Sequence, residues 1–357
     1  MKKKVLETLL AAAFCLTVIT GCAGNETSVE DSAEQSQVQE TEDAEETAEN
    51  DAEAETVASD YEPVTITVDL ERSGLGEKVE ETFTEPPTHV VAKGDQMADY
   101  FFDLGLENNM AGYTHGSCYS TVSQYDARET VPLLGDETGT FTKEELLAVE
   151  ADFLVGWDST FSEKNFDKDF CQENGIAMYT PYCTSDSATF EDIYKDYETL
   201  GEIFNVKEVA AQKVEAMKEK IAAVKETLGE DAYNNPVSVF VFDSGEDAPF
   251  TACQGMPGDI IKLAGGISTF DDIDAGWATV SWEQVVERNP EVILVLDYNG
   301  DTQEKIDFLY SNEALANVDA VKNKRIISAC CSDMQGSAGS AGTVEILAKA
   351  LYPEKFQ

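Results

Sequence analysis

Residues 280–296 read VSWEQVVERNPEVILVL and combine a helix start with a buried strand. Ser281 and Gln284 have the spacing of a capping box, in which two side chains satisfy backbone groups at the start of a helix. The apolar run 292–296 is too short for a typical helix and predicts a buried strand. A short helix followed by such a strand is typical of α/β proteins with a parallel sheet.

Residues 142–155, TKEELLAVEADFLV, carry the same two signals earlier in the chain. Thr142 and Glu145 form a second capping box, and residues 153–155 predict another buried strand. Further strands are predicted at residues 63–70, 88–92, 176–179, 237–242 and 325–328. Further helices are predicted at residues 96–104, 259–263, 302–310 and 343–351. This alternation predicts an α/β fold.

A helical tract separates the two α/β parts. Apolar residues recur at helical spacing in 190–204 and 206–228, and Gly229 stands at the position of a C-cap. We therefore predict two α/β lobes joined by a long spine helix. The predicted segments are a signal peptide (1–21), an acidic tether (22–60), an N-terminal lobe (61–189, with the binding part from about residue 88), a helical spine (190–230) and a C-terminal lobe (231–357).

The N-terminus has the pattern of an export signal. Three lysines at residues 2–4 precede an apolar stretch at about 9–19, which ends in Ile-Thr-Gly-Cys at residues 19–22. Small residues directly before a cysteine resemble the lipobox of bacterial lipoproteins. We expect cleavage before Cys22, with acyl chains such as palmitate on that cysteine, and an extracytoplasmic protein held at the cell membrane by lipid alone. The alternative is a plain secretory signal.

The charge of the chain excludes one class of partner. Seventy acidic residues against 24 basic ones give a net charge of −46, whereas nucleic-acid binding requires a basic surface. Residues 23–62 alone hold 15 Asp or Glu and no Lys or Arg. Such a segment cannot bury enough apolar surface to fold, so we expect a disordered tether, with an acidic docking tail as the alternative.

The cysteines leave the redox state open. Besides Cys15 in the signal and Cys22, six remain, at residues 118, 171, 183, 253, 330 and 331. Export permits disulfides, but no C-x-x-C motif is present and free buried thiols fit the pattern equally well.

Several motifs together resemble a known family, the solute-binding lipoproteins of ABC importers for iron-siderophore complexes, haem and cobalamin. The resemblance covers residues 61–357. It rests on the order and spacing of Pro87-x-His89-Val90-Val91-Ala92, residues 99–112 (DYFFDLGLENNMAG), 131–135 (VPLLG), 142–155, 263–266 (LAGG), 280–285 and 289–295 (NPEVILV). It departs from the family pattern at His89, at Ala98-Asp99 and at Ala151.

The resemblance implies a helical-backbone periplasmic-binding-protein fold with the ligand in a cleft between the lobes. It implies a monomer that docks on an ABC permease, which works with an ATPase. In such proteins one exposed carboxylate on each lobe pairs with permease arginines, and these positions fall on Asp99 and Glu283. No catalytic residue, resident cofactor or metal site is expected.

The cleft residues are predicted from the loops after strand ends, where open α/β sheets bind ligands. Aromatic side chains in these loops suit a large flat or macrocyclic ligand. The candidates are Trp157, Tyr113, His115, Tyr119, Phe250, Tyr182, Trp277 and Tyr298. Few Lys or Arg residues lie in the same loops, which favours a cobalamin-like corrinoid or a ferric hydroxamate over a triply anionic catecholate siderophore.

Three alternatives remain at this point. Haem is one, with Tyr113, Tyr119 or His115 as axial ligand. The others are a surface sensor or adhesin, and a hydrolase. The stretch 336–342 (GSAGSAG) has the composition of a nucleophile elbow in the wrong register, and no phosphate-binding G-x-x-x-x-G-K motif is present. We therefore expect a protein without enzymatic activity.

Overall fold

The structure is a computed structural model that describes residues 61–70, 78–116, 120, 122, 124–136, 139–298 and 300–357. Residues 59–357 form one compact unit. The predicted signal peptide, Cys22, the tether and Tyr119 lie outside the described residues. Within the described ranges, no helix is both long enough and apolar enough to cross a membrane.

The N-terminal lobe is built on a four-stranded parallel sheet with the order β4-β3-β5-β6. Its strands are β3 (Val90–Ala92), β4 (Met110–Tyr113), β5 (Phe153–Val155) and β6 (Ala177–Tyr179). The helices are α1 (Asp95–Leu104), α2 (Lys143–Ala148) and α3 (Lys168–Glu173). The capping box predicted at Thr142 and Glu145 opens α2, with both of its hydrogen bonds present.

The C-terminal lobe contains a second four-stranded parallel sheet, with the order β12-β11-β7-β9. Its strands are β7 (Val237–Phe242), β9 (Gly266–Ser268), β11 (Val292–Asp297) and β12 (Ile326–Cys330). Its helices are α7 (Gly255–Leu263), α8 (Trp282–Arg288), α9 (Thr302–Ser311), α10 (Asp319–Lys322), α11 (Cys331–Met334) and α12 (Ser340–Leu351). The predicted capping box at Ser281 and Gln284 opens α8.

The two sheets have the same topology. In each lobe the first strand lies between the second and the third, and the fourth lies outside the third. This makes β5 the counterpart of β11. It also makes α2, which leads into β5, the counterpart of α8, which leads into β11. The chain thus uses one α/β arrangement twice, which confirms the α/β prediction.

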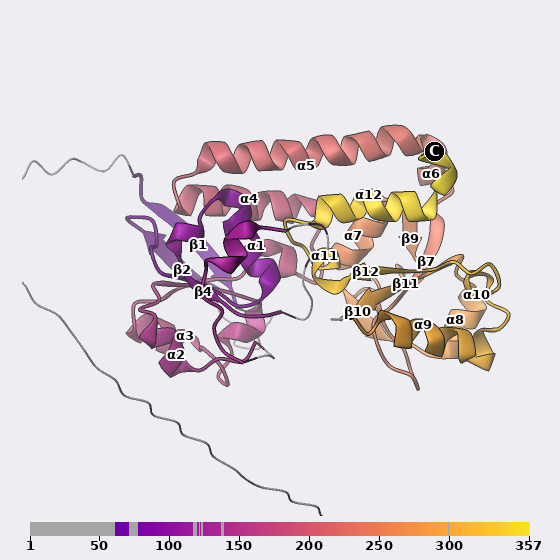
Figure 1. Cartoon of the computed structure of the whole chain (residues 1–357), viewed down its shortest axis with the longest axis horizontal. Coiled ribbons are helices and arrows are strands. Elements are labelled where there is room, and N and C mark those ends of the chain that lie inside the picture. Colours follow the sequence, from indigo (N-terminus) through magenta and orange to yellow (C-terminus); the bar gives the residue numbers. More distant parts are fainter. Residues whose placement is uncertain are drawn as a thin grey trace, which may run out of the picture. The chain divides into compact units, whose positions relative to one another are not determined.

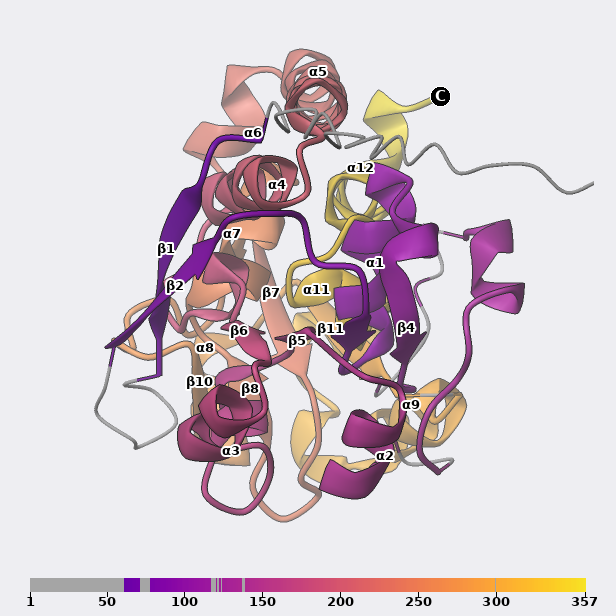
Figure 2. The ribbon, with the colours of Figure 1, turned by 90° about the vertical axis from the view of Figure 1, so that its left-hand side faces the viewer.

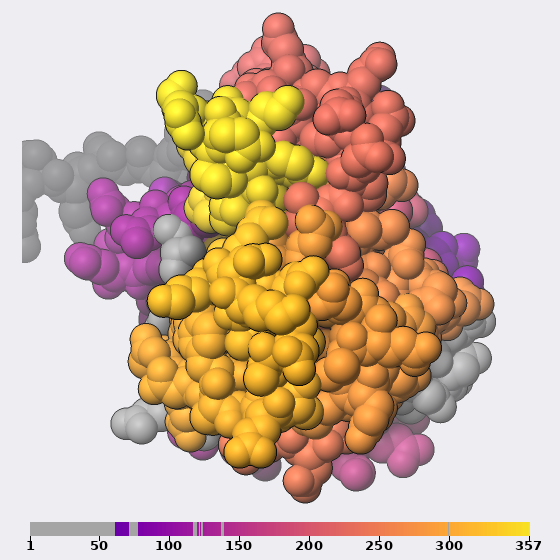
Figure 3. All heavy atoms as spheres, turned by 90° about the vertical axis from the view of Figure 1, so that its right-hand side faces the viewer, coloured from indigo at the N-terminus to yellow at the C-terminus, as the bar shows by residue number. Residues whose placement is uncertain are grey.

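The predicted spine consists of α4 (Phe190–Ile203) and α5 (Lys207–Leu228), followed by the short α6 (Glu230–Asn234). Helix α5 runs along one side of both lobes, above α4 on the N-terminal side and α12 on the C-terminal side (Figure 1). One face of α5 is buried at Val214, Met217, Ile221 and Val224, which follow the 3.6-residue period. Figure 3 shows α12 and α5 side by side over the C-terminal lobe.

Two separate antiparallel strand pairs accompany the parallel sheets. Strand β1 (Val64–Asp69) pairs with β2 (Lys78–Phe83), and Figure 2 shows this pair at one side of the N-terminal lobe. The predicted strand at 63–70 is therefore present but lies outside the parallel sheet. Strand β8 (Phe250–Ala252) pairs with β10 (Trp277–Thr279) in the C-terminal lobe.

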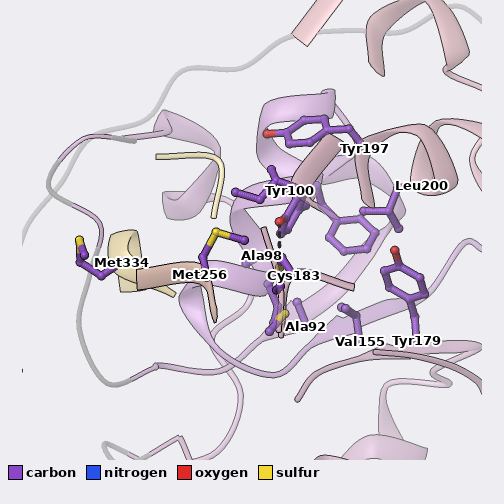
Figure 4. Close-up of a cluster of buried hydrophobic side chains, with 14 of the residues drawn as sticks. Ala92, Ala98, Tyr100, Val155, Tyr179, Cys183, Tyr197, Leu200, Met256 and Met334 are labelled. Atoms are coloured by element: carbon purple, nitrogen blue, oxygen red, sulfur yellow. Dashed lines mark hydrogen bonds between the residues drawn. The ribbon is translucent and has the colours of Figure 1, made fainter. Parts of the chain in front are cut away.

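A buried cluster continues from one lobe into the other. Figure 4 draws Tyr100 of α1, Tyr197 of α4 and Cys183 together with Met256 of α7 and Met334 of α11, all members of one cluster of buried side chains. The Tyr100 hydroxyl and the Cys183 thiol form a hydrogen bond of 3.3 Å. These side chains belong to a single hydrophobic core, so apolar packing and not only the spine holds the two lobes together.

The described cysteines include both thiols and a disulfide-bonded residue. Cys171, Cys183, Cys253 and Cys331 are free and buried, whereas Cys330 is disulfide-bonded. Burial raises the pKa of the free thiols, for Cys171 and Cys331 to about 12. These thiols are therefore protonated core residues at neutral pH.

Candidate functional site

A small cavity lies where the lobes meet. Trp157, which follows β5, lines it from the N-terminal lobe, and Trp277 of β10 lines it from the C-terminal lobe. Phe250 of β8 stacks on Trp277, with the ring centroids 5.5 Å apart. The cavity has a volume of about 40 Å³, which is too small to enclose a metal chelate. A chelate therefore has to bind at the mouth of the cavity, or the two lobes have to move apart to admit it.

A buried carboxylate fixes the loop that forms the N-terminal wall of this cavity. Asp196 of α4 accepts hydrogen bonds from the backbone N–H groups of Tyr182 and Cys183, at 2.7 and 3.0 Å, and from the Tyr179 hydroxyl at 2.6 Å. Burial raises the pKa of Asp196 to about 6. The 3-10 turn Tyr182–Thr184 is thereby held in place, and residues 183–186 reach the cavity.

Close backbone contacts bring the opposite lobe against this loop. Gly336 has φ of 89°, and a Cβ there would lie 2.9 Å from the Cβ and Sγ atoms of Cys183. A Cβ on Gly255, which has φ of 65°, would lie 2.6 Å from the carbonyl oxygen of Asp186. Glycine at these two positions permits both the left-handed backbone and the close approach of the lobes.

Two other aromatic candidates, Tyr298 and Tyr182, do not line this cavity. Tyr298, which follows β11, donates a hydrogen bond to Asp243, and burial together with that bond raises its pKa. Lys305 lies over the Tyr298 ring, 4.5 Å from its centroid. Tyr182 is half-buried, and the Nζ of Lys195 lies 3.5 Å from its ring centroid.

Tyr113 does not occupy the place that the sequence indicated. It is only 5% exposed, and its ring packs edge-on against Phe102 in the core. His115 is half-buried, with Nδ1 3.8 Å from Oδ2 of Asp95. The side chain at the end of β4 therefore points into its own lobe, and its burial does not support the prediction that Tyr113 contacts the ligand. Tyr119 is not among the described residues.

Asp99 cannot be the exposed docking carboxylate of the N-terminal lobe. It is fully buried on α1 and forms an ion pair with Arg128, which also pairs with Asp95 at 2.7 Å. Burial raises the pKa of Asp99 to about 7. Arg128 opposes this rise, whereas the carboxylates of Asp95 and Asp333 add to it. The Oδ2 atom of Asp99 is buried without a hydrogen-bond partner among the described residues.

Glu283 is exposed, as the docking prediction requires. It is the second residue of α8, where hydrogen bonds from the backbone and from Ser281 lower its pKa. Its topological counterpart is Glu144, the second residue of α2, which is also exposed. Both helices lie on the side of the body away from α5 (Figure 1). The sequence analysis did not single out Glu144. The signal was present, because Glu144 follows the capping residue Thr142 by two positions, as Glu283 follows Ser281.

Two larger cavities lie outside the small one between the lobes. One, of about 250 Å³, lies beyond the carboxyl end of β7 and is lined by Ser244, Glu246, Asp301 and Lys305 among others. The other, of about 480 Å³, lies between residues 187–189 and edge strand β9, and it shares Gln254 and Gly255 with the small cavity. Of these cavities, the small one is lined by a tryptophan from each lobe, so the cleft between the lobes remains the better candidate.

Comparison with known proteins agrees with this architecture. Residues 90–329, more than half of the chain, match the family described as periplasmic binding protein. The chain belongs to this family. It is 22% identical over 279 residues to the uncharacterized ABC transporter substrate-binding lipoprotein YvrC of Bacillus subtilis, covering 77% of this chain and 83% of the relative.

Two further proteins are similar to this chain, one over part of its length and one over most of it. A vitamin B12-binding protein of Vibrio campbellii is 27% identical over 152 residues, which are 42% of this chain and 51% of the relative. The crystal structure of a periplasmic binding protein from Veillonella parvula superposes with a TM-score of 0.73 at 27% identity. It covers 82% of this chain and 99% of the Veillonella chain. The predicted family and its two-lobed fold are thus confirmed.

Proposed function

We propose that this protein is an extracytoplasmic lipoprotein that captures a ferric siderophore or a corrinoid between its lobes and delivers it to an ABC importer. The observation that carries the proposal is the pair of tryptophans, Trp157 and Trp277, on opposite walls of the cleft. Aromatic faces on both sides suit a broad, partly apolar ligand. Relatives named as a substrate-binding lipoprotein and a vitamin B12-binding protein support it.

The proposal includes the anchor and the transporter. Cys22 follows small residues at the end of an apolar stretch, which supports lipid attachment there. Glu144 and Glu283 stand on equivalent helices of the two lobes and are exposed, which supports one docking contact from each lobe. The partners are an ABC permease and its ATPase. Haem receives less support, because Tyr113 is in the core and His115 lies beside Asp95.

Ligand binding is tested by thermal unfolding of the full chain in mild detergent. The compounds are cyanocobalamin, a ferric hydroxamate, a ferric catecholate and haemin. A ligand at 100 times its dissociation constant stabilises the folded state by about 2.7 kcal/mol, which raises the midpoint of a protein of this size by several degrees. We expect such a rise with cyanocobalamin or the hydroxamate. No rise with any compound would contradict the proposed cargo.

Replacing Trp157 by Ala should weaken binding of that ligand by about 1–3 kcal/mol, which is about 5- to 150-fold in the dissociation constant. The reason is the loss of one aromatic wall of the cleft. Titration calorimetry measures the effect. Tyr310→Ala is the matched control, because Tyr310 is 44% exposed on α9 and lines none of the cavities described above. Equal affinities for the Trp157 variant and the control would remove Trp157 from the site.

A further inference from the structure

The described lining of the small cavity between the lobes carries no positive charge. Among the described residues that line the cavity between the lobes, the only charged side chain is that of Asp186, a carboxylate. The others are aromatic, apolar, amide, hydroxyl, thiol or glycine residues.

Arg128 is the arginine closest in sequence to Trp157, and its charge is already balanced by two carboxylates of the protein. Arg128 pairs with Asp95 and Asp99, and only 16% of its side chain is exposed. Its guanidinium also lies 5.4 Å from the centroid of the Phe102 ring and 5.8 Å from that of Tyr113. Recruiting Arg128 for an anionic ligand would leave two buried carboxylates without their cation, which is energetically costly.

Lys305 of α9, which follows the loop after β11, is engaged in the same way. The Nζ of Lys305 lies 2.8 Å from Asp301 and donates a hydrogen bond of 2.7 Å to the carbonyl oxygen of Leu296. Only 13% of its side chain is exposed. Lys93, after β3, is half-buried, and burial lowers its pKa. One such lysine cannot balance the three negative charges of a ferric triscatecholate.

We propose that this cleft selects chelates without net negative charge, such as a neutral corrinoid or a neutral ferric trihydroxamate, and discriminates against ferric triscatecholates. The inference rests on the proposed function and narrows its ligand class. An anionic chelate would lose its hydration on entering the cleft. The described residues that line the cavity offer it one carboxylate and no cation to compensate for that loss. A neutral chelate loses less hydration and keeps the aromatic contacts of Trp157 and Trp277.

The first test compares dissociation constants of the full chain for three probes, cyanocobalamin, ferrichrome and ferric enterobactin. We expect cyanocobalamin or ferrichrome to bind at least about 100-fold more tightly than ferric enterobactin, a difference of about 2.7 kcal/mol. Ferric enterobactin binding as tightly as the better neutral probe would overturn the inference and leave the proposed function standing. Binding of none of the three would overturn both.

The second test reverses the charge of the wall. The double variant Asp186→Asn/Gln335→Arg places a guanidinium on the cavity and removes its carboxylate. Asp186→Asn/Gln335→Met is the matched control, because it changes the same two residues without adding a cation. We expect the Arg variant to bind ferric enterobactin at least about 10-fold more tightly than the control. Equal binding of ferric enterobactin by the two variants would overturn the assignment of charge selectivity to this wall.

Discussion

Uptake of the bound chelate should fall at least about 100-fold when Glu144 and Glu283 are both replaced by Gln, while the affinity for the chelate is unchanged. Both carboxylates are exposed at the second position of equivalent helices, α2 and α8. If each pairs with a permease arginine, losing one charge leaves the other unpaired in the interface, at a cost of about 2–5 kcal/mol. Transport assays with membrane vesicles or cells measure uptake, and calorimetry measures affinity.

The control for this experiment lies on the other side of the molecule. Glu219 and Glu226 are exposed on α5, and the double variant Glu219→Gln/Glu226→Gln removes the same amount of charge. This control should transport normally. Each single variant, Glu144→Gln or Glu283→Gln, should retain part of the uptake, because one docking contact persists. Normal uptake by the Glu144/Glu283 double variant would contradict the docking assignment.

The fold was predictable because its signals are local. The capping boxes at Thr142 and Ser281 and the apolar runs 153–155 and 292–296 each lie within a few residues of sequence, and all four elements form as predicted. The hairpin partner β2 and the short strands β8 and β9 were not predicted, since three to six residues of mixed polarity carry little periodic signal.

The site was less predictable because its residues act through distant partners. Asp99 looks like an exposed carboxylate until Arg128, 29 residues away, is placed against it. The burial of Tyr113 likewise depends on Phe102, a residue of a different element. Glu144 emerges as the counterpart of Glu283 only once the strand order of the two sheets is known. Pairings across elements are set by tertiary packing, which a single sequence does not display.

Replacing Arg128 by Met should lower the free energy of unfolding at pH 8 by about 3–5 kcal/mol, the cost of removing one partner from a buried ion pair. Arg128 is the cation shared by Asp95 and Asp99 on α1, and it ties the 3-10 turn Asp126–Glu129 to that helix. Lys349→Met is the control. It breaks an exposed pair with Glu345 on α12, and such pairs contribute at most about 0.5 kcal/mol. Urea unfolding monitored by circular dichroism measures both.

The loss should depend on pH in a defined direction. The pKa of Asp99 is about 7 in the folded protein, above the ordinary value of 3.8, chiefly because of burial. Between these two values the folded state binds a proton that the unfolded state has released. Stability from this group is therefore fully present at acidic pH and declines as the pH rises through 7. Without Arg128 the pKa of Asp99 rises further, so the difference between wild type and variant grows from pH 5 to pH 8.

The double variant Arg128→Met/Asp99→Asn separates this explanation from a simple loss of packing. Asparagine cannot ionise, so the double variant should recover part of the stability that Arg128→Met loses at pH 8 and should gain little at pH 5. The remaining deficit belongs to Asp95, which also loses Arg128 but keeps a hydrogen bond of 2.6 Å from the backbone N–H of Gly116. A loss of equal size at both pH values, with no recovery in the double variant, would contradict this electrostatic explanation and show that Arg128 stabilises the fold by filling space.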